Sequence, residues 1–193
     1  MAVSEVSICN NALARVSVER VASLTEPGEK AKKCNDFYAH ARDALLKAHN
    51  WNFAKGRASL AVLSSTPDFE YTNEFQLPND CLHVRTLFNY TGRWEVEGRK
   101  ILCNTDESLQ IKYTQKITAA SRFDALFVEA FELKLAAMFA IAFKSSVSLK
   151  DRYDKEFTAA IDQAISMNAI EDDVQGREAD QAAEESTWQT AGR

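Results

Sequence analysis

The sequence predicts an α+β fold: a helical bundle of about four helices, a small antiparallel β-sheet inserted between the second and third helices, and an extended C-terminal arm. Apolar residues recur at helical spacing near both ends of the chain, and their period shortens towards two in between. The expected segments are an N-terminal helical hairpin (1–55), an antiparallel β region (56–118), a C-terminal helical hairpin that completes the bundle (119–170) and an acidic arm (171–193).

Two apolar stripes predict the N-terminal hairpin. Ser4 is a suitable N-cap, because its hydroxyl can accept a hydrogen bond from a free backbone N–H of the first turn. The stripe of this first helix contains Val6, Cys9, Leu13 and Val16. After a turn at residues 25–28, a second helix is expected over residues 29–49, with one face formed by Cys34, Phe37, Ala41, Leu45 and Ala48.

Short runs of β-forming residues follow, separated by turn residues. Glycine-containing turns at residues 91–93 and 97–99 separate neighbouring runs. We therefore expect a meander in which each strand pairs with the next along the chain. The expected strands are 58–63, 74–77, 83–90, 94–97, 100–103 and 109–114.

The C-terminal hairpin is predicted from two further helical patterns. Residues 124–144 are apolar on nearly all sides, so other elements or neighbouring subunits must cover this helix. Ser148 is the expected N-cap of the last helix, whose stripe contains Leu149, Tyr153, Phe157, Ile161 and Ile165.

The charge is balanced everywhere except in the arm. The chain has 23 basic and 28 acidic residues, of which the arm holds 2 and 7, so residues 1–170 hold 21 of each. A balanced body disfavours a duplex-binding surface, although a local basic patch remains compatible with it. Trp188 is the only aromatic residue of the arm. Two interpretations stay open: an arm that is loose or docked on a partner, and a frayed terminus in which Trp188 has no role.

Chemical motifs are scarce. No phosphate-binding glycine loop, zinc-protease motif or nucleophile elbow occurs, and the four cysteines form no CxxC pair, which favours buried thiols. Cys81 and His83 could form a thiolate–imidazolium pair, but a core cysteine beside an edge histidine is the favoured interpretation. We therefore expect no catalytic residue, no cofactor and no metal.

Three aromatic residues, Phe37, Trp51 and Phe53, could stack on a ligand. A structural seam between helices and sheet is the favoured interpretation, since aromatic residues commonly join two layers. No leader segment is recognised, and the uncharged apolar run 135–143 is far shorter than the roughly 20 residues that a membrane span needs. We expect synthesis in a cytoplasm and no membrane anchor.

Several local patterns occur in a fixed order along the first half of the chain. They are NALA (11–14) with VASL (21–24), CNDFY (34–38) leading through RDALL (42–46) to WNFA (51–54), and LPNDCL (77–82). In order and spacing, these patterns resemble the tail tubular protein A family, the head-to-tail adaptors or connectors of short-tailed bacteriophages. The similarity is best between about residues 6 and 87. No single motif is diagnostic, and the combination carries the resemblance.

The resemblance implies a non-enzymatic virion protein. Its homo-oligomeric ring of twelve subunits would lie at the portal vertex, bind the portal protein and the tail nozzle or tail fibre proteins, and touch genomic DNA transiently during ejection. The arm then becomes the expected partner-binding segment, with Trp188, Glu184, Glu185 and Arg177 as its candidate residues. The alternatives are a DNA-packaging or regulatory helical module and, less favoured, a small hydrolase using Cys81 and His83.

Overall fold

The computed structural model describes residues 3–191, with side chains described over residues 3–172. Two compact units form: a helical unit of Met1–Tyr38 with Phe123–Arg193, and a β unit of Ala39–Arg122. The predicted α+β class is confirmed, because the described residues form four α-helices and two three-stranded antiparallel sheets. The β unit begins inside the second helix, at Ala39.

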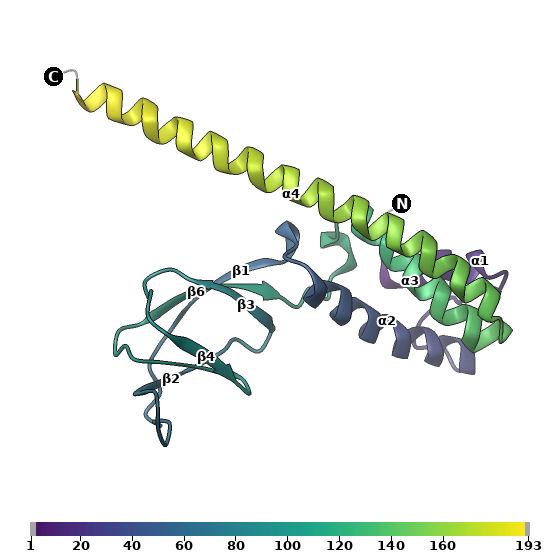
Figure 1. Cartoon of the computed structure of the whole chain (residues 1–193). Coiled ribbons are helices and arrows are strands. Elements are labelled where there is room, and N and C mark those ends of the chain that lie inside the picture. The colour runs from purple at the N-terminus through teal and green to yellow at the C-terminus, as the bar shows by residue number, and fades with distance from the viewer. Residues whose placement is uncertain (1–2, 192–193) are drawn as a thin grey trace. The chain divides into compact units, whose positions relative to one another are not determined.

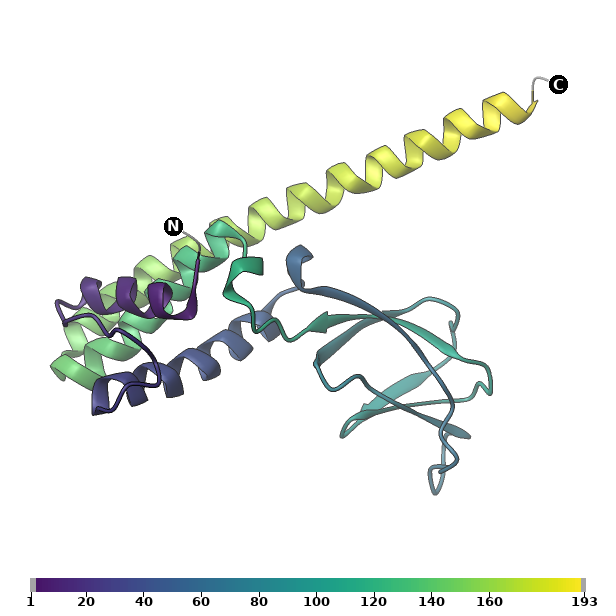
Figure 2. The ribbon, with the colours of Figure 1, turned by 180° about the vertical axis from the view of Figure 1, so that it is seen from behind.

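The helical unit is built from α1 (Glu5–Arg15), the first part of α2 (Glu29–Ala48), α3 (Ala125–Lys144) and α4 (Val147–Ala191). Figures 1 and 2 show α1, α3 and the first part of α4 side by side. The predicted cap at Ser4 is confirmed, since Ser4 Oγ accepts from the Ser7 N–H at 3.1 Å. Asp124 caps α3 by accepting from the Leu126 N–H at 2.8 Å.

The predicted cap at Ser148 is wrong by two residues. Ser145 ends α3 in the left-handed conformation with φ of 48°, and α4 then begins at Val147. The hydroxyl of Ser146 accepts from the Leu149 N–H at 3.3 Å, so Ser146 supplies the capping side chain. Ser146 and Ser148 lie two residues apart, and sequence spacing alone did not show which of them caps α4.

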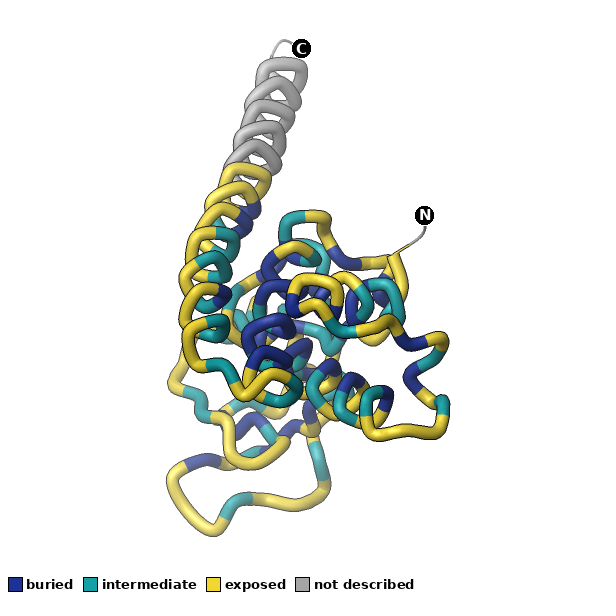
Figure 3. Tube along the Cα trace, turned by 90° about the vertical axis from the view of Figure 1, so that its right-hand side faces the viewer, coloured by how far each residue is buried: buried dark blue, intermediate teal, exposed yellow. Residues whose placement is uncertain are grey.

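The core of the helical unit surrounds α3. Phe127, Phe131 and Phe139 are fully buried, as the apolar character of nearly every face of this helix requires. On α4, the buried residues Tyr153, Ala164 and Asn168 recur on one side of the helix (Figure 3). Residues 169–172 are all exposed, so Asn168 is the last buried residue among the described side chains of α4.

The β unit contains the second part of α2, two short 3-10 helices, η1 (Asn52–Ala54) and η2 (Ala120–Arg122), and six strands. All six predicted strands exist, and two have the predicted bounds. Their ranges are β1 (Lys55–Leu60), β2 (Asn73–Gln76), β3 (Cys81–Leu87), β4 (Trp94–Glu97), β5 (Lys100–Cys103) and β6 (Leu109–Gln115).

The predicted meander is wrong. The strand orders are β1-β6-β3 and β2-β5-β4, so only β4 and β5 pair as chain neighbours. The two most buried strands take the central positions: β5 has three buried residues of four, and β6 has four of seven. The strands with the largest buried fraction therefore lie at the centre of each sheet, with a partner strand on both sides. Their order along the chain does not determine this position.

One glycine is required where β1 crosses an aromatic ring. Gly56 is the register partner of Tyr113 on β6, and a Cβ atom at Gly56 would lie 2.7 Å from Tyr113 Cζ. The Tyr113 hydroxyl also donates to Asp80 Oδ1 at 3.2 Å, which fixes the ring in this position. The core beneath contains Phe75, Ile101 and Leu109.

Candidate functional site

The candidate partner-binding residues of the arm, Arg177, Glu184, Glu185 and Trp188, lie outside the residues whose side chains the structure describes. The helical backbone of α4 continues through these positions to Ala191. Their role in binding a partner stays a prediction.

The three aromatic residues of the expected seam fall in both units. Phe37 packs in the helical unit, with its ring centroid 6.0 Å from that of Phe139. Trp51 and Phe53 stack in the β unit at 5.9 Å, and the indole N–H of Trp51 donates to the Leu45 carbonyl at 2.9 Å. Each ring therefore has a packing partner within its own unit, and the joint role of the three stays a prediction.

Cys81 and His83 both lie on the edge strand β3, but a β-bulge separates them. Burial raises the pKa of the Cys81 thiol, and burial lowers the pKa of His83. A thiolate–imidazolium pair needs both shifts in the opposite direction. Cys81 belongs to the apolar core of the β unit, in agreement with the favoured interpretation of this pair.

All four cysteines are buried and free. Cys9 on α1 and Cys34 on α2 form one contact that the sequence did not predict, because 25 residues separate them. A hydrogen bond with Cys34 is the largest cause that raises the pKa of Cys9, and the same bond lowers the pKa of Cys34. The two thiols therefore lie close together within the helical unit, one on each helix.

The NALA segment and its neighbour Asn10 have structural roles within the helical unit. The amide of Asn10 donates to the Val21 carbonyl at 2.9 Å and accepts from the Val21 N–H at 2.8 Å, which ties the VASL segment to α1. Asn11 Nδ2 donates to Glu132 Oε1 at 2.7 Å. Burial, the largest cause, raises the pKa of Glu132 despite this bond and the Arg15 guanidinium 3.7 Å away.

The RDALL and LPNDCL patterns have structural roles in the β unit. Arg42 is buried although it is charged, and its Nε lies 2.8 Å from Asp43 Oδ1. Lys116 Nζ lies 2.6 Å from Asp43 Oδ2. Burial is the largest influence and raises the pKa of Asp43, but the bonds from Arg42 and Lys116 together outweigh it and lower that pKa. Asp80 accepts from Gln115 Nε2 at 2.7 Å, which ties the LPNDCL loop to β6.

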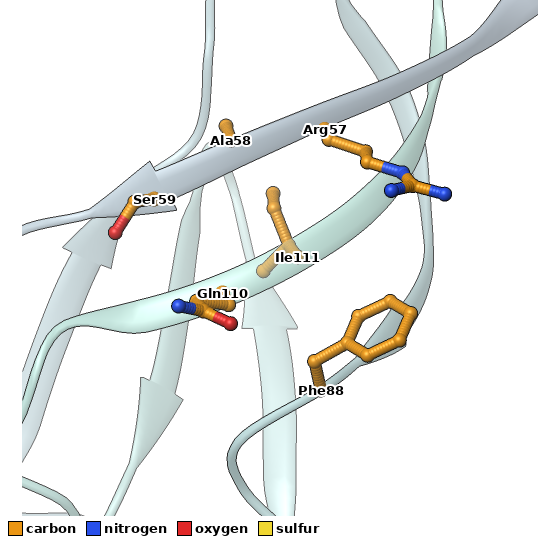
Figure 4. A pocket seen from close by; sticks show the side chains of 6 residues that line it. All are labelled: Arg57, Ala58, Ser59, Phe88, Gln110 and Ile111. Atoms are coloured by element: carbon orange, nitrogen blue, oxygen red, sulfur yellow. The ribbon is translucent and has the colours of Figure 1, made fainter. Parts of the chain in front are cut away.

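A hollow of about 340 Å³ lies on the β1-β6-β3 sheet (Figure 4). Arg57 and Phe88 extend into it from β1 and from the segment after β3, on either side of β6. No sequence signal could have found this hollow, since its residues are spread over more than fifty positions and follow no known motif. It is lined by Arg57, Ala58, Ser59, Phe88, Gln110 and Ile111.

Two further features are absent from the described residues. Among them, no group of three or more His, Cys, Asp or Glu side chains is arranged to hold a metal ion. No helix within the same residues has the length and apolar character needed to cross a membrane. In comparisons with known proteins, neither a family model nor a curated sequence matches this chain.

Proposed function

We propose that this protein is a structural component of a bacteriophage virion, a tail tubular or head-to-tail adaptor protein that forms a ring. One observation carries the proposal: among the described side chains of α4, the last buried one is Asn168, whereas the helix backbone continues to Ala191. At about 1.5 Å per residue, the 45 residues of α4 would span about 68 Å, against about 30 Å for the 20 residues of α3. A helix more than twice as long as its neighbour has the length to bind another chain.

The charges of the two units also support assembly. The helical unit has 12 basic and 19 acidic residues, a net charge of -7, and the β unit has 11 and 9, a net charge of +2. A ring needs a head-to-tail interface between two different surfaces of each subunit. Units of opposite net charge provide such surfaces, and their attraction weakens as salt increases.

In this proposal the ring has twelve subunits and lies at the portal vertex of the virion. It binds the portal protein through the arm, joins the portal to the tail nozzle or tail fibre proteins, and forms part of the channel for genome ejection. Its contact with genomic DNA is transient and independent of sequence. It uses no cofactor or metal and has no catalytic site or membrane anchor.

The alternative of a DNA-packaging or regulatory helical module needs a strongly basic helix face. The lysines at the start of α2 supply little free charge for it. Lys33 Nζ lies 2.7 Å from Glu29 Oε1, and Lys30 Nζ lies 3.1 Å from Glu19 Oε2. The alternative of a Cys81–His83 hydrolase is disfavoured by the pKa directions of that pair.

Negative-stain electron microscopy with native mass spectrometry of the full chain tests the proposal. We expect rings with an axial hole and close to twelve subunits, either for the protein alone or after mixing with the portal protein of the same phage. A monomer under both conditions would overturn the adaptor function.

Variants of the arm test its role. A chain ending at residue 170 is expected to keep its melting temperature, since every buried residue that the structure describes is retained, and to lose portal binding. Its helical circular dichroism should fall only by the share of the helical residues removed. Trp188→Ala tests the aromatic anchor, and Glu184→Gln with Glu185→Gln tests the charge of the same segment. Unchanged portal binding by the truncated chain would discard the arm as the anchor.

A further inference from the structure

Two cations lie side by side on one face of the β1-β6-β3 sheet without a counter-charge. Arg57 on β1 and Lys112 on β6 are direct register partners, an arrangement that costs stability for like charges. No carboxylate among the described residues pairs with either one. By contrast, four other cations of the β unit each have an acidic partner: Arg42, Arg93, Lys100 and Lys116. The pair therefore presents uncompensated positive charge on one sheet face.

An exposed aromatic ring lies beside this pair. Phe88 is 56% exposed, and its ring centroid lies 4.4 Å from Lys112 Nζ. The Phe88 N–H donates to the Gln110 carbonyl at 2.9 Å, so the backbone holds the ring next to β6. A large apolar side chain held in the open next to a cation offers a stacking surface to a planar ligand.

The hollow supplies the remaining contacts. Ser59 and Gln110 are exposed register partners that also line the hollow, and they offer a hydroxyl and an amide. The volume of about 340 Å³ is at the lower end of the range of small-ligand sites. Positive charge, a π face and neutral hydrogen-bonding groups thus border one cavity (Figure 4).

We infer that this sheet face binds single-stranded nucleic acid. A phosphodiester matches Arg57 and Lys112, since the guanidinium fork can hold two phosphate oxygens. An unpaired base matches the ring of Phe88, and the edge of that base lies within the reach expected of Ser59 or Gln110. An acidic peptide would use the two cations alone, and a duplex would keep its bases from the ring.

This site goes beyond the proposed function, which requires only weak contact with genomic DNA. It belongs to a single β unit, so its test does not depend on ring formation. Failure of the nucleic-acid test leaves the adaptor proposal standing, and failure of the ring test leaves this site standing.

Fluorescence anisotropy of the full chain with labelled 15-nucleotide dT and rU oligomers tests the inference. We expect Phe88→Ala to weaken binding by about 5- to 150-fold, the range for loss of one base stack. Arg57→Ala with Lys112→Ala should reduce the slope of log affinity against log salt by about 1.4, which is the loss of two phosphate contacts to a single strand.

Lys47→Ala with Arg122→Ala is the matched control, because it removes one lysine and one arginine from exposed positions elsewhere in the same unit. Its affinity is expected to remain that of the wild type, and circular dichroism melts establish that every variant folds. Equal affinity of the site and control variants overturns the inference. So does equal affinity for a duplex of the same length, or binding of a synthetic 171–193 peptide at these residues in place of the oligomers.

Discussion

The helical unit and the β unit differ in how they hold their charged groups. In the helical unit, Glu132 lies in the core with Asn11 as its nearest partner, and burial raises its pKa. In the β unit, Asp43 lies between Arg42 and Lys116, and these bonds lower its pKa. The helical unit thus contains a carboxyl group that resists ionisation, whereas the β unit contains one that ionises readily. For these two carboxyl groups, the direction of the pKa shift follows the number of cations within bonding distance and not burial alone.

The units also differ in how their cores arise. One helix, α3, contributes the three largest fully buried side chains of the helical core. The core of the β unit takes residues from several strands, such as Leu60 on β1 and Leu109 on β6. Both cores depend on contacts between residues distant in sequence, since α3 packs against the N-terminal segment, as in the Phe37–Phe139 ring contact.

The largest expected effect comes from removing one buried aromatic ring in each unit. Phe131→Ala on α3 and Phe75→Ala on β2 should each lower the free energy of unfolding by about 3–5 kcal/mol, from lost burial and the cavity left behind. Urea denaturation followed by circular dichroism measures both. A loss below about 1 kcal/mol for either variant would show that its ring is not in a packed core.

Removing the Asp43 carboxylate tests the electrostatic difference between the two units. Asp43→Asn should cost about 1.5–3 kcal/mol, because buried Arg42 loses a charged hydrogen-bond partner. Since the pKa of Asp43 is lowered on folding, the stability that it contributes is present above the ordinary pKa and is lost as pH falls. The variant should lack this acid-dependent loss in urea denaturation at a series of pH values. Lys116→Met, at an exposed site, should cost only about 0.2–1 kcal/mol.

Overpacking tests the close approach of β1 to the Tyr113 ring. Gly56→Ala should lower the free energy of unfolding by about 1–3 kcal/mol, since the new methyl group overlaps a ring that is held by Asp80. Ser59→Ala, on an exposed position of the same strand, is the control and should change stability by less than about 0.5 kcal/mol. Equal melting temperatures for the two variants would contradict the close contact.

The smallest expected effect is in the helical unit, where the pH dependence of stability should have the opposite sign to that expected from Asp43. Because the pKa of Glu132 is raised on folding, the folded state holds the proton more tightly, and stability falls as pH rises above the ordinary glutamate value. Glu132→Gln should flatten this fall in thermal melts taken between about pH 4 and pH 8. Glu171→Gln, at an exposed position of α4, should leave it in place.

The sequence predicted features whose causes are local. The Ser4 cap, the start of α2 at Glu29 and the β4–β5 hairpin depend on residues a few positions apart, and all were predicted correctly. The pairing of β1 with β6 joins residues about fifty positions apart, and no local pattern specifies it. The same is true of the binding hollow, whose cations are meaningful only once Arg57 and Lys112 become register partners.

The burial of Arg42 was missed for a related reason. A charged residue in an amphipathic helix is normally assigned to the solvated face. Here the carboxylate at the next position and Lys116, 74 residues away from Arg42, form a network with the buried side chain. Such networks depend on tertiary contacts, and hydrophobic periodicity contains no information about them.

The sheet topology has a consequence for the protein at high concentration. Because each sheet has three strands, four of the six described strands are edges, which offer unpaired backbone groups to other chains unless another segment covers them, as the Val62–Phe75 bridge does at β2. Two edges are four residues long, and β4 carries Glu95 and Glu97 whereas β1 carries Lys55 and Arg57. Short length and charge are known protections against edge-to-edge aggregation. When many copies are made at once, these strand-edge charges would therefore keep newly folded chains from joining through their sheets.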